Sequence, residues 1–323
     1  MIGTLLAGAL LMGPDAGAVT IRQVAPPVAT QSAEQDAPIP LEGVTVTGRP
    51  LTQLIQQFVN EVAAPNRGRG LARWDTRICV GVANLQVETA QYLADRISTV
   101  AGDLGVETGG PGCSPNLMIV ATADGAALAR DMVEEHERAM RLGGAGMDQG
   151  RSALEEFQTG DRPVRWWQVS MPTDTDSGQA AVRLPGDCIG SCYGGGSAAS
   201  FAPNISVFAA SRLNTQIVDN LFRTIVIVDV DDVADLSIQQ LADYIAMVSL
   251  AQIDPDADTT AYATILNVFN DPGTATQLTD WDLAYLRGLY GAVRGDSNLR
   301  AGRTEIRDSI RREHEALREE AVD

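Results

Sequence analysis

The stretch DLSIQQLADYIAMVSLAQIDP, from Asp235 to Pro255, decides the fold that we predict for this chain. Ser237, followed three residues later by Gln240, has the capping-box pattern that starts a helix. The helix then continues through a long apolar run. It ends at Asp254-Pro255, because the residue before a proline disfavours helical geometry.

Three further segments follow this helix, and their order is informative about the fold. They are a polar loop, a short apolar turn at residues 265–269, and a second capped helix over residues 278–291. Long helix, loop, buried turn and second helix together resemble the C-terminal half of the metzincin zinc peptidases. An ordinary amphipathic core helix followed by another helix is the alternative explanation of residues 235–291.

The zinc ligands of that family are missing from the helix. Metzincins carry H-E-x-x-H-x-x-G-x-x-H, whose three histidines bind zinc while the glutamate acts as general base. The three ligand positions fall here on Ala242, Ala246 and Gln252, and the glutamate position falls on Asp243. The turn at residues 265–269 also lacks the family's methionine. The resemblance therefore implies an inherited frame without metal, cofactor or peptidase activity.

The amino-acid composition excludes several classes of function. The net charge is −18, which argues against binding the phosphate backbone of nucleic acids. All 24 basic residues are arginine, so Schiff-base and Walker A lysines are excluded. The two histidines, His136 and His314, lie in charged helical stretches, where we expect solvated side chains.

The N-terminus and the cysteines indicate export. Residues 2–12 are an apolar run and Ala16-Gly17-Ala18 has the form of a signal-peptidase site, so residues 1–18 are expected to be a signal peptide. No other run has the ~18 apolar residues of a membrane span. We expect a periplasmic or secreted protein with two disulfides. The most economical of three pairings joins Cys79 to Cys113 and Cys188 to Cys192.

The domain organisation is predicted from the pattern of residue types along the chain. Residues 19–50 read as a Pro/Ala-rich linker, residues 51–295 as a single metzincin-like α+β domain, and residues 296–323 as a charged helical tail, solvated or facing a partner. We predict a twisted mixed sheet with a βαβ start, then the long helix, the buried turn and a C-terminal helix. Strands are expected at residues 78–82, 117–121, 164–170, 205–209 and 224–228.

A binding groove is the functional hypothesis that we favour. Trp166 and Trp167 are adjacent on one strand, so their side chains point to opposite faces, one into the core and the other into a groove. We expect that groove to be lined also by Ala242, Asp243 and Ala246. It would hold a peptide as an added strand, or a cell-envelope protein.

Two other functions are compatible with the sequence. A hydrolase that uses carboxylates or a divalent ion requires two carboxylates that converge in the groove. A structural envelope protein requires a filled groove and an apolar patch near residues 40–60 or 300–323. The acidic loop from Asp229 to Asp235 fits either the dipole of the following helix or a calcium ion.

Overall fold

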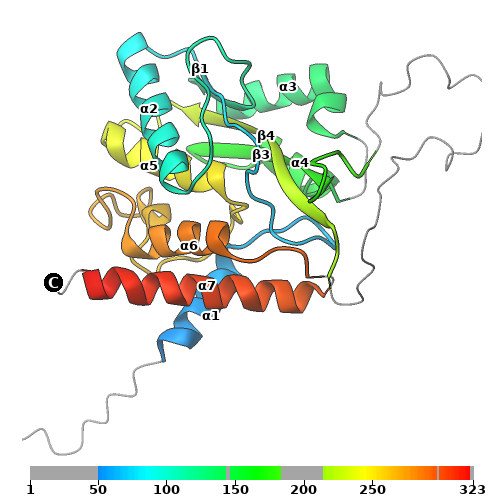
Figure 1. Cartoon of the computed structure of the whole chain (residues 1–323). Coiled ribbons are helices and arrows are strands. Elements are labelled where there is room, and N and C mark those ends of the chain that lie inside the picture. The colour runs from blue at the N-terminus through cyan, green and yellow to red at the C-terminus, as the bar shows by residue number, and fades with distance from the viewer. Residues whose placement is uncertain (1–49, 143–145, 183–213, 297, 321–323) are drawn as a thin grey trace, which may run out of the picture. The chain divides into compact units, whose positions relative to one another are not determined.

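The fold is α+β, as the sequence predicts (Figure 1). The computed structural model describes residues 50–142, 146–182, 214–296 and 298–320, all within one compact unit that spans Arg49–Asp323. The signal peptide, nearly all of the linker, Cys188, Cys192 and the strand predicted at residues 205–209 lie outside the described residues.

Four strands form a mixed sheet in the order β1-β2-β4-β3. β1 (Val80–Ala83), β2 (Leu117–Thr122) and β4 (Ile217–Asp229) are parallel, and β3 (Val164–Asp174) is antiparallel to β4 at one edge. β1, helix α2 (Val87–Asp103) and β2 make the predicted βαβ start. β4 lies inside the sheet, consistent with its continuous apolar run.

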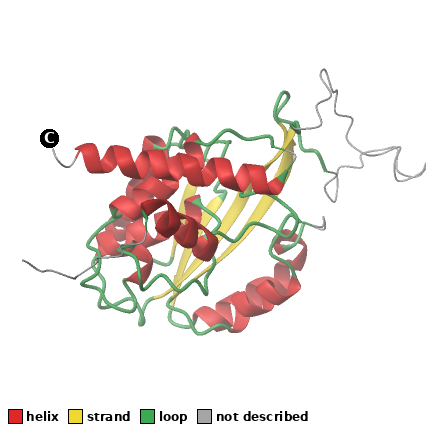
Figure 2. Cartoon of the chain, turned by 90° about the horizontal axis from the view of Figure 1, so that it is seen from below, coloured by secondary structure: helices red, strands yellow, loops and turns green. Residues whose placement is uncertain are grey.

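Helices cover both faces of the sheet (Figure 2). α3 (Gly125–Met140) and α4 (Arg151–Thr159) pack on one face, whereas α2 and α5 (Ile238–Leu250) lie on the other. β3 separates the two cores. Trp166 contacts the larger cluster around α5, and Trp167 belongs to the smaller cluster under α3 and α4.

α5 is buried along nearly its whole length, and both of its ends are capped by side chains. The capping box of Ser237 and Gln240 forms as predicted. At the other end, side chains from three distant segments bind the final carbonyl groups, which no helical N–H can reach. Gln168 donates to Val248 O and Ala251 O, Trp74 to Ser249 O, and Tyr290 to Leu250 O, at distances of 2.8–3.0 Å.

The buried turn and the C-terminal helices follow α5. The turn is a 3₁₀ helix, η2 (Ile265–Asn267), and it is followed by α6 (Asp280–Gly291) and α7 (Leu299–Glu320). α7 packs on α6 and on α1 (Leu51–Val62). Since α7 buries one of its faces, the expectation of a solvated tail is wrong for that face.

The apolar face of α7 was not predicted from the sequence because charged residues surround it. Ile306, Ile310 and Leu317 recur at helical intervals within a strongly charged segment. His314 shares this buried face, with its ring 4.8 Å from that of Trp281, so its expected exposure is also wrong. His136 is exposed, as expected.

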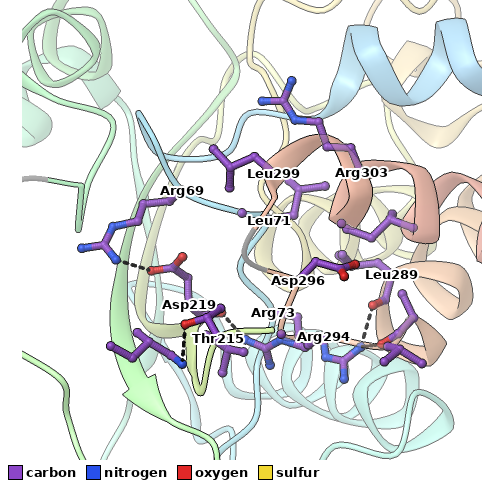
Figure 3. A pocket seen from close by; sticks show the side chains of 18 of the residues that line it. Arg69, Leu71, Arg73, Thr215, Asp219, Leu289, Arg294, Asp296, Leu299 and Arg303 are labelled. Atoms are coloured by element: carbon purple, nitrogen blue, oxygen red, sulfur yellow. Dashed lines mark hydrogen bonds and ion pairs between the residues drawn. The ribbon is translucent and has the colours of Figure 1, made fainter. Parts of the chain in front are cut away.

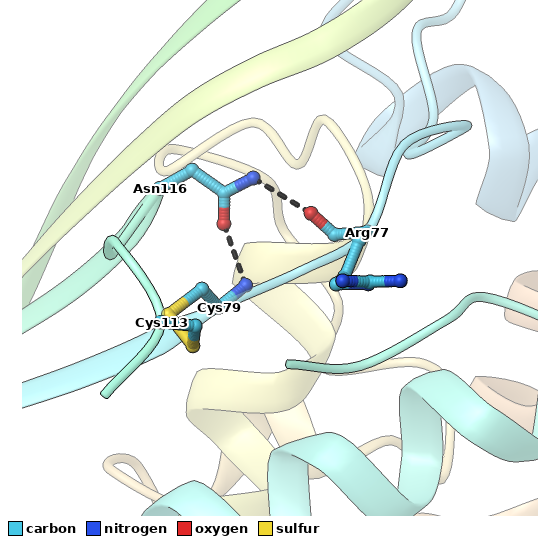
Figure 4. Close-up of a disulfide and its surroundings, with 4 residues drawn as sticks. All are labelled: Arg77, Cys79, Cys113 and Asn116. Atoms are coloured by element: carbon cyan, nitrogen blue, oxygen red, sulfur yellow. Dashed lines mark hydrogen bonds between the residues drawn. A yellow bond between two sulfur atoms is a disulfide. The ribbon is translucent and has the colours of Figure 1, made fainter. Parts of the chain in front are cut away.

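Cys79 and Cys113 are joined by a disulfide, with their Cα atoms 6.0 Å apart (Figure 4). Asn116 sits beside the bridge. Its side chain accepts from Cys79 N at 2.7 Å and donates to Arg77 O at 2.9 Å, which holds the chain that enters β1. Across the described ranges, no helix combines the length and apolar character that crossing a bilayer requires.

Candidate functional site

The structure separates the residues that we expected to share one groove. Ala242, Asp243 and Ala246 have 0% exposed surface and lie within the larger core, because α2 and the sheet cover α5. Trp167 is also buried, and its Nε1 donates to Met140 O at 2.8 Å. Trp166 is only partly buried, with its ring 6.3 Å from that of Tyr244.

The residues at the metzincin ligand positions do not fit a zinc ion. Ala242 and Ala246 offer no donor atom. The amide of Gln252 is occupied within the core, where Oε1 accepts from Ala72 N at 2.7 Å and Nε2 donates to Asn66 Oδ1 at 3.2 Å. Asp243 is held by Arg96 and by the backbone N–H of Leu278, so it is not available as a base.

An open cleft nevertheless runs along β3. We call it the edge groove. It encloses about 360 Å³, its floor is residues 165–168, and its walls are α4 and the segment Ile253–Asp256. The volume lies within the ~300–1,000 Å³ that is usual for ligand clefts. Of the five predicted groove residues, only Trp166 and Trp167 line it.

The backbone of β3 presents unpaired groups to this groove. Residues in an antiparallel strand alternate between bonding their partner strand and pointing away from it. Asp229 N donates to Pro163 O, so residues 163, 165 and 167 face β4. The N–H and C=O groups of Val164, Trp166 and Gln168 therefore point outward, and no described residue bonds them.

The same edge is closed further along the strand. Ser170 N donates to Met147 O at 2.8 Å, and Pro172 O accepts from Ala181 N at 2.7 Å. Several outward groups beyond residue 168 are thus already paired with the protein's own backbone. The unpaired stretch at Val164, Trp166 and Gln168 reaches the edge groove at Trp166 and Gln168.

Two side-chain bridges connect residues that line the edge groove. Gln149 Nε2 donates to Ala64 O. Arg162 Nη2 lies 3.1 Å from Glu156 Oε1 and 2.5 Å from Asp256 Oδ1, which connects α4 to the segment after α5. None of these residues was predicted from the sequence to line a groove, and only Asp254-Pro255, the predicted helix stop, lies in this wall.

The acidic side chains of the edge groove are paired with an arginine at the protein surface. Glu156 and Asp256 converge on one guanidinium nitrogen, but their side chains are 49% and 73% exposed. Arg165, on the opposite face of β3 from Trp166, is buried and donates to Phe157 O at 3.0 Å. Desolvation lowers the pKa of Arg165, although Asp229 opposes the shift.

The acidic loop that follows β4 is held by backbone hydrogen bonds. Asp229 accepts from Gly125 N at 3.0 Å and from Asp231 N at 3.3 Å. Within the part of the chain that the structure describes, no three metal-ligating side chains gather at one point.

No known protein family, curated protein or solved structure matches the chain in comparisons with all three.

Proposed function

We propose that this chain is an exported metzincin-like binding domain, without zinc and without peptidase activity, that holds an extended peptide along β3. One observation carries the proposal. The outward N–H and C=O groups of Val164, Trp166 and Gln168 are unpaired within the described chain, and Trp166 and Gln168 lie at the floor of an open groove.

Strand addition is the binding mode that uses such groups. An added peptide strand pairs its backbone with the free edge, and the pockets beside the edge select its side chains. Trp166 and Phe157 line the edge groove with aromatic surface, on which an apolar peptide side chain can be buried. Arg162, together with Glu156 and Asp256, adds charged groups at the rim.

Export is supported by the disulfide. Bridges between cysteines persist in oxidising compartments and are rare in the cytosol, so Cys79–Cys113 favours a periplasmic or secreted location. The A-x-A site at residues 16–18 agrees with this location.

The test is selection from a displayed library of random seven-residue peptides against the full chain. The selected peptides are then N-methylated at one position at a time. Strand pairing predicts that methylation at alternate positions abolishes binding, while methylation at the positions between is tolerated.

Two matched variants of α4 test whether the peptide binds in the edge groove. Ser152 and Thr159 are both exposed hydroxyl residues on α4, but only Ser152 lines the edge groove. Ser152→Tyr is expected to block binding, and Thr159→Tyr is expected to leave it unchanged. Equal affinity of both variants, or tolerance of N-methylation at every position, would contradict the proposal.

A hydrolase is the second candidate, because Glu156 and Asp256 converge on Arg162 in the groove. This candidate predicts that the chain hydrolyses a bound peptide and that Asp256→Asn abolishes the hydrolysis. The structural envelope role has less support, since the edge groove is open and the apolar face of α7 is covered by α6 and α1.

A further inference from the structure

A second cavity lies on another side of the domain and shares no lining residue with the edge groove. It encloses about 360 Å³ between the segment 68–73, the start of β4 and the segment that joins α6 to α7 (Figure 3). Because its polar side is built from arginines, we call it the arginine pocket.

Positive charge dominates the arginine pocket, although the chain as a whole carries −18. The charged residues that line it are four arginines and two aspartates, namely Arg69, Arg73, Arg294, Arg303, Asp219 and Asp296. A cavity of opposite sign to its protein concentrates anions.

Arg73 and Arg294 lie close enough to repel one another. Nη1 of Arg73 donates to the carbonyl oxygens of Leu289, Tyr290 and Ala292 at the end of α6. Nη2 of Arg294 donates to Asp219 O and to Asn220 Oδ1. Desolvation lowers the pKa of Arg294 to about 10, and the charge of Arg73 adds to that shift.

Each of these two guanidinium groups keeps further N–H groups that hydrogen-bond to no described residue. Their nearest carboxylate is Asp75, whose oxygen lies 4.0 Å from Arg294 Nη1 and whose side chain is 60% exposed. An anion between Arg73 and Arg294 would offset the cost of burying two like charges.

Asp219 is the second polar feature with an unmet bond. It is 9% exposed, and its Oδ1 accepts no hydrogen bond. Arg69 Nη1 is 3.7 Å from that oxygen, an ion-pair distance that is too long for a hydrogen bond. Desolvation raises the pKa of Asp219, against the opposing charges of Arg69 and Arg294. A hydrogen-bond donor on a ligand would satisfy this oxygen.

Apolar side chains also line the arginine pocket. They are those of Leu71, Leu289, Leu299 and Ile306. Gly302 lies near Asp296, in the first turn of α7. A Cβ at this position would meet only Asp296 Cβ, at 3.8 Å, so the missing side chain widens the pocket.

We propose that the arginine pocket binds a small apolar organic acid that carries a hydroxyl or amino group next to its carboxylate. The carboxylate takes the free N–H groups of Arg73 and Arg294. The neighbouring donor bonds Oδ1 of Asp219. The apolar body packs on the leucines that line the pocket.

Calorimetric titration of the full chain tests the assignment with three related probes. They are 2-hydroxy-4-methylpentanoate, its neutral amide, and 4-methylpentanoate, which lacks the hydroxyl group. The hydroxy acid is expected to bind saturably and to weaken with added salt. Losing either the charge or the donor is expected to weaken binding at least about tenfold, since a hydrogen bond to a charged group contributes ~1.5–3 kcal/mol.

Two substitutions in α7 test the location. Gly302→Leu fills the pocket and improves helix propensity, so it is expected to abolish binding without unfolding the chain. Ala301→Leu, at the exposed neighbouring position, is the control and is expected to bind normally. Leu299→Gln, at a 41% exposed position in the apolar lining, is expected to weaken binding with the fold retained.

Three results would overturn the proposal. They are binding of the amide as tightly as the acid, unchanged affinity in both Gly302→Leu and Leu299→Gln, and no heat of binding from the hydroxy acid at millimolar concentration.

Discussion

Arg96 of α2 and Asp243 of α5 form a two-point ion pair inside the domain. Nε of Arg96 donates to Oδ1 at 2.6 Å and Nη2 donates to Oδ2 at 3.1 Å, while Asp243 has 0% exposed surface. The hydrogen bond to Asp243 is the main reason why the pKa of Arg96 is raised. Asp243, which the predicted resemblance aligns with the metzincin glutamate, thus serves the packing of α2 on α5.

Removing the arginine of this pair should be strongly destabilising. Arg96→Met leaves the Asp243 carboxylate buried without its cation, which typically costs ~3–5 kcal/mol. Urea unfolding followed by tryptophan fluorescence measures the loss. The double variant Arg96→Met/Asp243→Asn keeps an acceptor for Leu278 N and should recover much of it. A single variant as stable as the parent would show that the pair contributes little.

A pair of glycine substitutions tests whether α7 belongs to the domain. A Cβ on Gly288 of α6 would lie 2.5 Å from Ile310 Cα, so Gly288→Ala should force α7 away and cost on the order of 1–3 kcal/mol. Gly102, in α2, has no atom near that position, and Gly102→Ala should stabilise by up to ~1 kcal/mol. Thermal unfolding compares the two. Equal melting temperatures would mean that α7 is not firmly packed.

The buried carboxyl of Asp282 predicts a pH dependence. Its oxygens accept from Thr279 N and Ile265 N, each at 2.9 Å, and from the hydroxyl groups of Thr264 and Thr279. Desolvation outweighs these bonds and raises the pKa of Asp282. The folded state therefore binds more protons than the unfolded state above pH ~4, so stability falls as pH rises from there through the folded pKa.

Comparison with Asp282→Asn isolates this contribution. Asparagine does not titrate, so the variant should lose less stability than the parent between pH 4 and 7, even if it is less stable at every pH. Urea unfolding at several pH values measures both slopes. Parallel slopes would count against a raised pKa at Asp282.

The disulfide should matter for both stability and location. Cys79 and Cys113 are 34 residues apart, and closing a loop of that length contributes about 3–4 kcal/mol in the chain-entropy treatment. Cys79→Ala/Cys113→Ala should lower the free energy of unfolding by that amount under oxidising conditions. Peptide mapping of the native protein without reductant should find the two residues joined. Free thiols at both positions in cell-envelope material would contradict the disulfide.

Elements with strong local signals were predicted from the sequence. The capping box at Ser237, the βαβ start and the continuous apolar run of β4 each arise from neighbouring residues, and all three are present. The same holds for the opposite orientations of Trp166 and Trp167, which follow from the pleat of a strand.

The groove could not be located in the same way, because it depends on contacts between distant segments. Arg96 is 147 residues from Asp243, and their pairing turns the acid away from any cleft. Arg162 reaches Asp256 across 94 residues. No local pattern shows that β3 is an edge strand or that its backbone is covered only from Ser170 onward.

Amide hydrogen exchange, with and without a selected peptide, is the decisive measurement for strand addition on β3. Bound peptide is expected to slow exchange at Val164, Trp166 and Gln168, whose N–H groups point outward, while Arg165 and Trp167 are already protected by β4. Slowed exchange at these three alternate residues alone would establish strand addition on β3. Unchanged exchange at all three, with the peptide fully bound, would contradict it.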